Sequence, residues 1–209
     1  MAMQQHEAVV VGASLVSFIP GVSFEQRQAV KLASLWAETV TLQDMAKEPQ
    51  QEQYAYYRKK LMYLGWDATS AEEVHWPDLQ RPRIVDQALS KIDAVAGAQH
   101  SSSMALAFEA LKRNGKPLLH FESRSRDRAQ FQLLSCAPVS GNYVDIVVYH
   151  EAGNTAVFTN GFLFHQRRNM RVAAELVRFN TRLFNQERRS SVERALVKIA
   201  LKEIHEMEV

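Results

Sequence analysis

The most apolar stretch of the chain is residues 8–22, AVVVGASLVSFIPGV, which contains a Pro-Gly pair near its end. It is shorter than the roughly 20 residues that a transmembrane helix needs. The residues before it, MAMQQHE, lack the positive charge that begins a signal peptide. We therefore expect a buried strand or core segment. The alternatives are the membrane-inserting segment of a soluble toxin and a signal peptide.

The next apolar segments have the periodicity of amphipathic helices, because apolar residues recur every three or four positions. Four segments follow this pattern: 24–46, 51–64, 82–96 and 101–115. Ser23 is a typical N-cap for the first segment, and Gly65 and Gly97 follow the second and third where a C-terminal cap is expected. Residues 67–81 have no regular pattern. The segments predict two pairs of helices, each packed as an αα-hairpin.

From residue 117 the pattern changes to that of short strands separated by turns. The expected strands are 118–123, 130–137, 143–150 and 156–165. Links as short as Ser-Gly-Asn at 140–142 favour a four-stranded antiparallel meander. A helical period then returns over 165–189 and 190–207, as two helices or one long one.

Helices, then strands, then helices predict an α+β fold. We expect a single domain over residues 1–209, and the alternative is a division into a helical part, 1–115, and a part with the sheet and C-terminal helices, 116–209. Hydrophobic residues make up 46% of the 209 and charged residues 23%, which is an ordinary globular composition. The net charge of +2 is too small to drive nucleic-acid binding by itself.

Cysteine usage indicates a reducing compartment, because Cys136 is the only cysteine and no intrachain disulfide can form. We therefore expect a cytoplasmic protein, and secretion without a cleaved signal peptide is the alternative. The strand pattern around Cys136 predicts a buried, inert thiol rather than a nucleophile.

A row of arginines is the most distinctive polar feature. On the expected helix, Arg171, Arg178, Arg182 and Arg189 fall within about 40° of one another, and Arg168 extends the row. Guanidinium groups favour carboxylates and phosphates, so the row predicts a surface for an anionic partner. Glu175 on the same face supports the alternative, a solvated helix face with local ion pairs.

Aromatic residues gather on the expected helix 51–64. Tyr56 and Tyr63 fall on a different face from Tyr54, Tyr57 and Leu61, so one core cannot easily cover all of them. Tyrosine is enriched at interfaces, and the pattern favours an additional packing surface, against the sheet or a second subunit.

Catalytic signals are weak. His120 and Glu122 share one face of an expected strand, and His150 lies on another, so these three are the candidate catalytic residues. The paired cysteines that accompany a His-x-Glu motif in zinc deaminases are absent. Walker, dinucleotide-binding and nucleophile-elbow motifs are absent too, so we expect no metal and no cofactor, and in particular no nucleotide cofactor.

The sequence therefore favours a non-catalytic interaction or assembly protein that binds a protein, or another anionic partner, through the arginine row. Self-association is equally compatible with the surplus aromatics, and anionic lipid or nucleic acid are further candidate partners. The first alternative is a soluble, toxin-like, membrane-active protein, and the second is a hydrolase-type enzyme with its site on the sheet.

Overall fold

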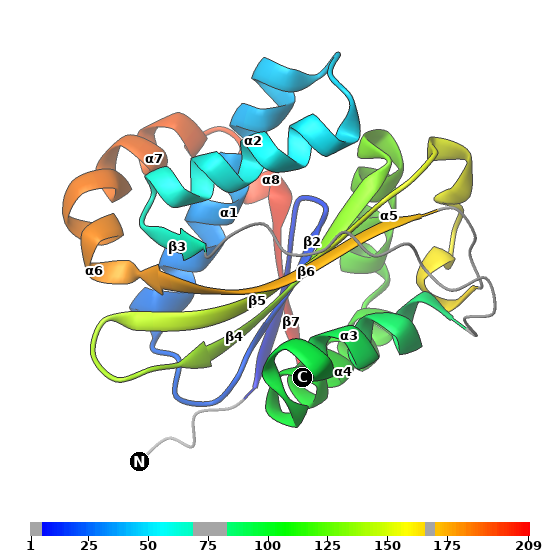
Figure 1. Ribbon diagram of the computed structural model, residues 1–209, viewed down its shortest axis with the longest axis horizontal. Coiled ribbons are helices and arrows are strands. Elements are labelled where there is room, and N and C mark those ends of the chain that lie inside the picture. Colours follow the sequence, from blue (N-terminus) through cyan, green and yellow to red (C-terminus); the bar gives the residue numbers. More distant parts are fainter. Residues whose placement is uncertain (1–5, 69–82, 166–169) are drawn as a thin grey trace.

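The computed structural model describes residues 6–68, 83–165 and 170–209. Within these ranges one seven-stranded sheet lies between two layers of helices (Figure 1). The strand order is β3-β6-β5-β4-β2-β1-β7, and β2 and β4 form the parallel pair in an otherwise antiparallel sheet. The expected α+β class is confirmed in this mixed form. The expected order of elements is wrong, because two strands precede the first helix.

The apolar N-terminal segment forms two adjacent inner strands of the sheet. β1 (Glu7–Val11) and β2 (Ser14–Phe18) pair as a hairpin, and nearly all of their residues are buried. Gly12, with φ of 57°, lies in the turn between them. The expectation of a core segment is therefore confirmed, with two strands rather than one.

The first helix pair agrees with the sequence. α1 (Phe24–Met45) begins with a capping box in which Ser23 and Gln26 bond to each other's backbone N–H groups. α2 (Gln50–Tyr63) packs beside α1 above the sheet (Figure 1). Gly65 follows its C-cap, with a φ of 101° that few other residues adopt. β3 (Trp66–Ala68) follows at one edge of the sheet. Most of the segment expected to be irregular, 67–81, lies outside the described residues.

The second helix pair lies on the opposite face of the sheet (Figure 1). α3 (Ile84–Ala96) and α4 (Ala98–Arg113) pack together, as expected, and a third helix, α5 (Gly115–Arg128), follows. The strand expected at 118–123 is therefore wrong. The buried face of α5 carries Pro117, Glu122 and Ser125 beside Phe121, so the apolar period of the helix is hidden in the sequence.

Two of the four expected strands are confirmed, β4 (Gln130–Pro138) and β5 (Tyr143–Ala152). The strand expected at 156–165 is wrong, because two short 3₁₀ turns, Thr155–Val157 and Phe162–Phe164, occupy that region. They bury Phe158, Phe162 and Leu163 against α5 and its neighbours. Asn154 caps the first turn, where its side chain accepts a hydrogen bond from the Ala156 N–H.

The C-terminal region differs most from expectation. The helix expected at 165–189 is wrong over its first half, where β6 (Arg171–Asn180) pairs with β5 along its whole length. Helix begins only afterwards, with α6 (Thr181–Leu183), a π-helical turn (Phe184–Arg188) and α7 (Arg189–Leu196). The expected helix 190–207 also ends early, because α8 (Ala200–Glu203) leads into β7 (Ile204–Glu208) at the far edge of the sheet. The meander thus has three strands, β4, β5 and β6.

Two apolar cores flank the sheet, and alternate residues of each strand enter them. On β5, for example, Val147 and Tyr149 face α3, α4 and α5, whereas Ile146 and Val148 face α1, α2 and α7. Both faces of the sheet are therefore covered, which is why several strands lack a clean polar–apolar alternation. No helix in the described ranges is both long and apolar enough to cross a membrane.

Candidate interaction surface

The expected arginine stripe does not exist as one helix face. Arg171 and Arg178 lie on β6, Arg182 on α6 and Arg189 on α7, and Arg168 lies outside the described residues. The helical interpretation fails because β6 is apolar on both faces: Val172 enters one core, and Val177 and Phe179 enter the other. That arrangement mimics a helical period in sequence.

Most of these arginines have intramolecular partners. Arg171 donates to Gln51 on α2, and Arg189 Nε lies 2.8 Å from Glu193 Oε1 one turn away. Arg178 forms a two-bond pair with Asp145, at 2.7 and 2.9 Å. Arg182 is exposed. The alternative of a solvated face with local ion pairs therefore describes Arg178 and Arg189 well.

Glu175 does not neutralise the arginine row. Its side chain is 6% exposed and faces α2, where Arg58 Nε and Nη2 each donate to it at 2.6 Å. The Tyr54 hydroxyl donates a third bond at 3.0 Å. Burial and the Glu175 carboxylate raise the pKa of Tyr54 well above its ordinary value. This network fastens α2 to the sheet.

Tyr63 at the end of α2 is exposed and held between two neighbours. Its ring is 54% exposed and stacks on Trp36 of α1, with ring centroids 6.2 Å apart. On it lies the Arg188 guanidinium, whose Cζ is 4.2 Å from the ring centroid. This cation–π contact brings the π-helical turn to the end of α2. The expectation that Tyr63 lies on a different face of the helix from Tyr57 and Leu61 is confirmed, since those two side chains are buried and that of Tyr63 is exposed.

Exposed apolar side chains adjoin Tyr63. Met62 is 50% exposed, and Leu183, 36% exposed, packs against the Gly65 turn that follows. Arg182 precedes Leu183 and is exposed as well. We call this set, Met62, Tyr63, Arg182, Leu183 and Arg188, the Tyr63 surface. Tyrosine, methionine and arginine are the residue types enriched at protein interfaces.

The three candidate catalytic residues do not converge. His120 lies on α5, with Nε2 3.1 Å from Glu203 Oε2. Glu122, on the same helix, is buried and accepts a 2.6 Å hydrogen bond from the Gly161 N–H. His150 faces α2 on the other side of the sheet, where its ring stacks on Tyr54 at 3.9 Å. A single site that uses all three is therefore excluded.

His120 belongs to an ion-pair cluster near the C-terminus. Arg124, one turn along α5, also donates to the Glu203 carboxylate, at 2.9 Å through Nε. Burial raises the pKa of Glu203, but the hydrogen bonds from His120 and Arg124 outweigh it and bring the pKa to about 2. The His205 ring lies 4.3 Å from that of His120, and burial lowers the pKa of His205. The cluster fastens α5 to α8 and β7.

Cys136 lies on β4 inside the core beneath α1. Burial raises the pKa of its thiol, so thiolate does not form at neutral pH. The expectation of a buried thiol is confirmed. Among the described residues, no group of three or more His, Cys, Asp and Glu is arranged to hold a metal ion.

Sequence reasoning missed the most informative residue of the Tyr63 surface, Arg188. Arg188 was absent from the predicted row because it lies on a different face of the expected helix. Its place over Tyr63 depends on the π-helical turn, which adds a residue to one helical turn and rotates the side chains that follow. No local sequence signal identifies that turn.

Comparison with known proteins adds little. No protein-family model matches the sequence, and no curated protein matches it. Among solved structures, that of the Evf virulence factor is similar over 96% of this chain and 84% of that chain, at 14% identity and a TM-score of 0.32. A likeness at this level carries no argument about fold or function.

Proposed function

We propose that this chain is a non-catalytic interaction protein that binds an acidic, partly apolar segment of a protein partner at the Tyr63 surface. The observation that supports the proposal is the exposed Tyr63 ring, which is fixed between Trp36 and Arg188 rather than free in solvent. A rigid aromatic side chain loses little entropy on binding, and tyrosine and arginine are the types most often found at interface hot spots.

Charge selects the partner. Arg182 and Arg188 border the exposed apolar side chains of Met62 and Leu183, and the carboxylate near Arg188, that of Glu187, lies 4.0 Å away. A carboxylate from a partner can approach Arg188 more closely than that, and an apolar partner side chain can cover Met62 and Leu183. The fit is therefore to a segment in which acidic and apolar residues alternate or adjoin.

The test is affinity capture from the native source with the wild-type chain and two matched variants. Arg188→Glu reverses one charge on the Tyr63 surface, and Arg113→Glu reverses one at the exposed end of α4, on the opposite face. We expect a discrete protein partner with the wild type and with Arg113→Glu. Its recovery falls several-fold with Arg188→Glu and when salt is raised from ~50 to ~300 mM.

Three results would count against the proposal. Equal recovery with both variants would separate the partner from this surface. Recovery of nucleic acid or lipid in place of protein would assign another class of partner. Recovery of a second copy of the chain alone would make the surface one for self-association.

A further inference from the structure

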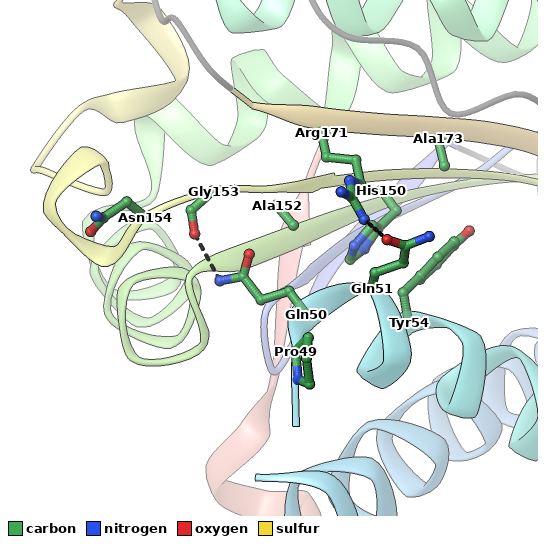
Figure 2. A pocket seen from close by; sticks show the side chains of 10 residues that line it. All are labelled: Pro49, Gln50, Gln51, Tyr54, His150, Ala152, Gly153, Asn154, Arg171 and Ala173. Carbon is green, nitrogen blue, oxygen red and sulfur yellow. Dashed lines mark hydrogen bonds between the residues drawn. The ribbon is translucent and has the colours of Figure 1, made fainter. Parts of the chain in front are cut away.

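A cleft lies between the start of α2 and the surface of β5 and β6, on the α2 side of the sheet (Figure 2). Its volume is about 310 Å³, room equivalent to about ten water molecules at roughly 30 Å³ each. The described residues that line it are Pro49, Gln50, Gln51, Tyr54, His150, Ala152, Gly153, Asn154, Arg171 and Ala173. It is therefore of the size that a small organic molecule occupies.

The polar floor of the cleft contains a buried side chain with an unused hydrogen-bonding atom. His150 is 3% exposed, and its Nδ1 has no hydrogen-bond partner among the described residues. Burial lowers the pKa of His150 to about 3, so the ring is neutral at physiological pH. Nδ1 itself has almost no accessible surface, so a ligand in the cleft meets the ring of His150 and not this atom.

Arg171 is the one charged side chain among the described residues that line the cleft. Its Nη1 donates to Gln51 Oε1, which directs the guanidinium toward the start of α2 (Figure 2). Glu175, two residues along β6, is bonded to Arg58 and Tyr54 and does not line the cleft. The charged group that the described lining residues contribute to the cleft is therefore a cation.

The start of α2 adds to this positive charge. Gln50 and Gln51 are the first residues of a 14-residue helix, and the residue before them, Pro49, makes no side-chain cap. A helix N-terminus carries a partial positive charge and backbone N–H groups that favour anions. The Gln50 side chain extends to the end of β5, where its Nε2 donates to Gly153 O at 2.7 Å and to Ala129 O at 3.3 Å.

We propose that this cleft binds a small monocarboxylate with a compact apolar body. The carboxylate lies between Arg171 and the start of α2, beside the ring of His150. The body packs on Pro49, Ala152 and Ala173. One full positive charge and one helix end match a monoanion better than a doubly charged phosphate. The site lies at the opposite end of α2 from the Tyr63 surface and is independent of the function proposed above.

Benzoate is the probe, because it combines one carboxylate with a body of suitable size. Titration of the full chain, followed by calorimetry and by NMR of the histidine side chains, is expected to show one saturable site and a shift of the His150 ring signals. Arg171→Gln removes the cation and is expected to weaken binding about tenfold or more. Arg178→Gln, on the same strand but paired with Asp145 outside the cleft, is the control and leaves the affinity unchanged.

Gln51→Glu gives a second variant that does not depend on the stability of β6. Gln51 is exposed in the first turn of α2, where a carboxylate suits the helix, so folding is preserved. Its carboxylate competes with the ligand for Arg171, and benzoate binding is expected to fall tenfold or more. Circular dichroism confirms that both variants are folded.

The proposal is overturned if benzoate shows no saturable binding up to ~50 mM, the concentration of a very weak site. Equal binding by the wild type, Arg171→Gln and Gln51→Glu would place any benzoate elsewhere on the molecule. Inorganic phosphate that binds as tightly as benzoate would exclude the preference for a monocarboxylate.

Discussion

Removal of the Arg58 side chain tests how α2 is held on the sheet. In Arg58→Met the buried Glu175 carboxylate loses two 2.6 Å hydrogen bonds and its counter-charge, and keeps the 3.0 Å bond from Tyr54. An ionised group left unpaired at a buried site costs about 3–5 kcal/mol. That is a large part of the roughly 5–15 kcal/mol by which a domain of this kind is stable. Urea unfolding at neutral pH measures the loss directly.

The double variant Arg58→Met/Glu175→Met is the control. An apolar pair of similar volume leaves no buried charge. We therefore expect the free energy of unfolding of the double variant to lie within about 1–2 kcal/mol of that of the wild type. Tyr54→Phe removes one hydrogen bond to the carboxylate and is expected to cost about 1 kcal/mol. The reasoning is refuted if Arg58→Met loses less than about 1 kcal/mol, or if the double variant is as unstable as the single one.

Three further predictions concern ionisation and the β1–β2 turn. The pKa of His150 in the folded protein is about 3, so between pH ~6.5 and 3 only the unfolded chain binds a proton at this side chain. The free energy of unfolding therefore falls by up to about 1.4 kcal/mol per pH unit below pH ~6.5. His150→Asn is expected to lack this pH dependence in denaturant titrations from pH 7 to 4. The pKa of Glu203 in the folded protein is about 2, so its contribution to stability is complete above pH ~4.5 and is lost as the pH falls toward 2. Thermal unfolding of Glu203→Gln is expected to lack this loss of stability between pH 4.5 and 2. Gly12→Ala places a Cβ against the Glu38 carboxylate at φ of 57° and costs about 1–3 kcal/mol in urea; an unchanged midpoint would contradict this.

The N-terminal half could be predicted because its local signals agree with its packing. Ser23 and Gln26 form the capping box of α1, and Gly65 and Gly97 end their helices at positive φ. The run 8–22 is mostly apolar because β1 and β2 are covered on both faces. In these segments period, caps and burial all indicate the same element.

The C-terminal half could not be predicted because tertiary contacts determine its elements. Glu175 and Glu122 occupy buried faces, where Arg58 and the Gly161 N–H satisfy them, so neither strand period nor helical period is visible. The helix expected at 165–189 followed from the spacing of its arginines and apolar residues, which on β6 belongs to a strand that is apolar on both faces.

The candidate sites depended on these assignments. Tyr63 could be assigned to an outer face from the α2 pattern alone, since that helix was correctly predicted. Arg188 reaches it through a π-helical turn. Arg171 lines the same cleft as His150 because β6 pairs with β5 so that Ala173 lies opposite His150. Both relationships join segments that are distant in sequence, and no short-range spacing encodes them.

Photo-crosslinking tests the proposed interaction surface most directly. A photoreactive amino acid at position 62 lies on the Tyr63 surface, and one at position 119, where Leu119 is 62% exposed on α5, lies on the opposite face. Illumination in the native cell is predicted to yield one discrete protein adduct from position 62 and none from position 119, and Arg188→Glu reduces the yield. The same adduct from both positions, or none from position 62, would contradict the assignment of this surface.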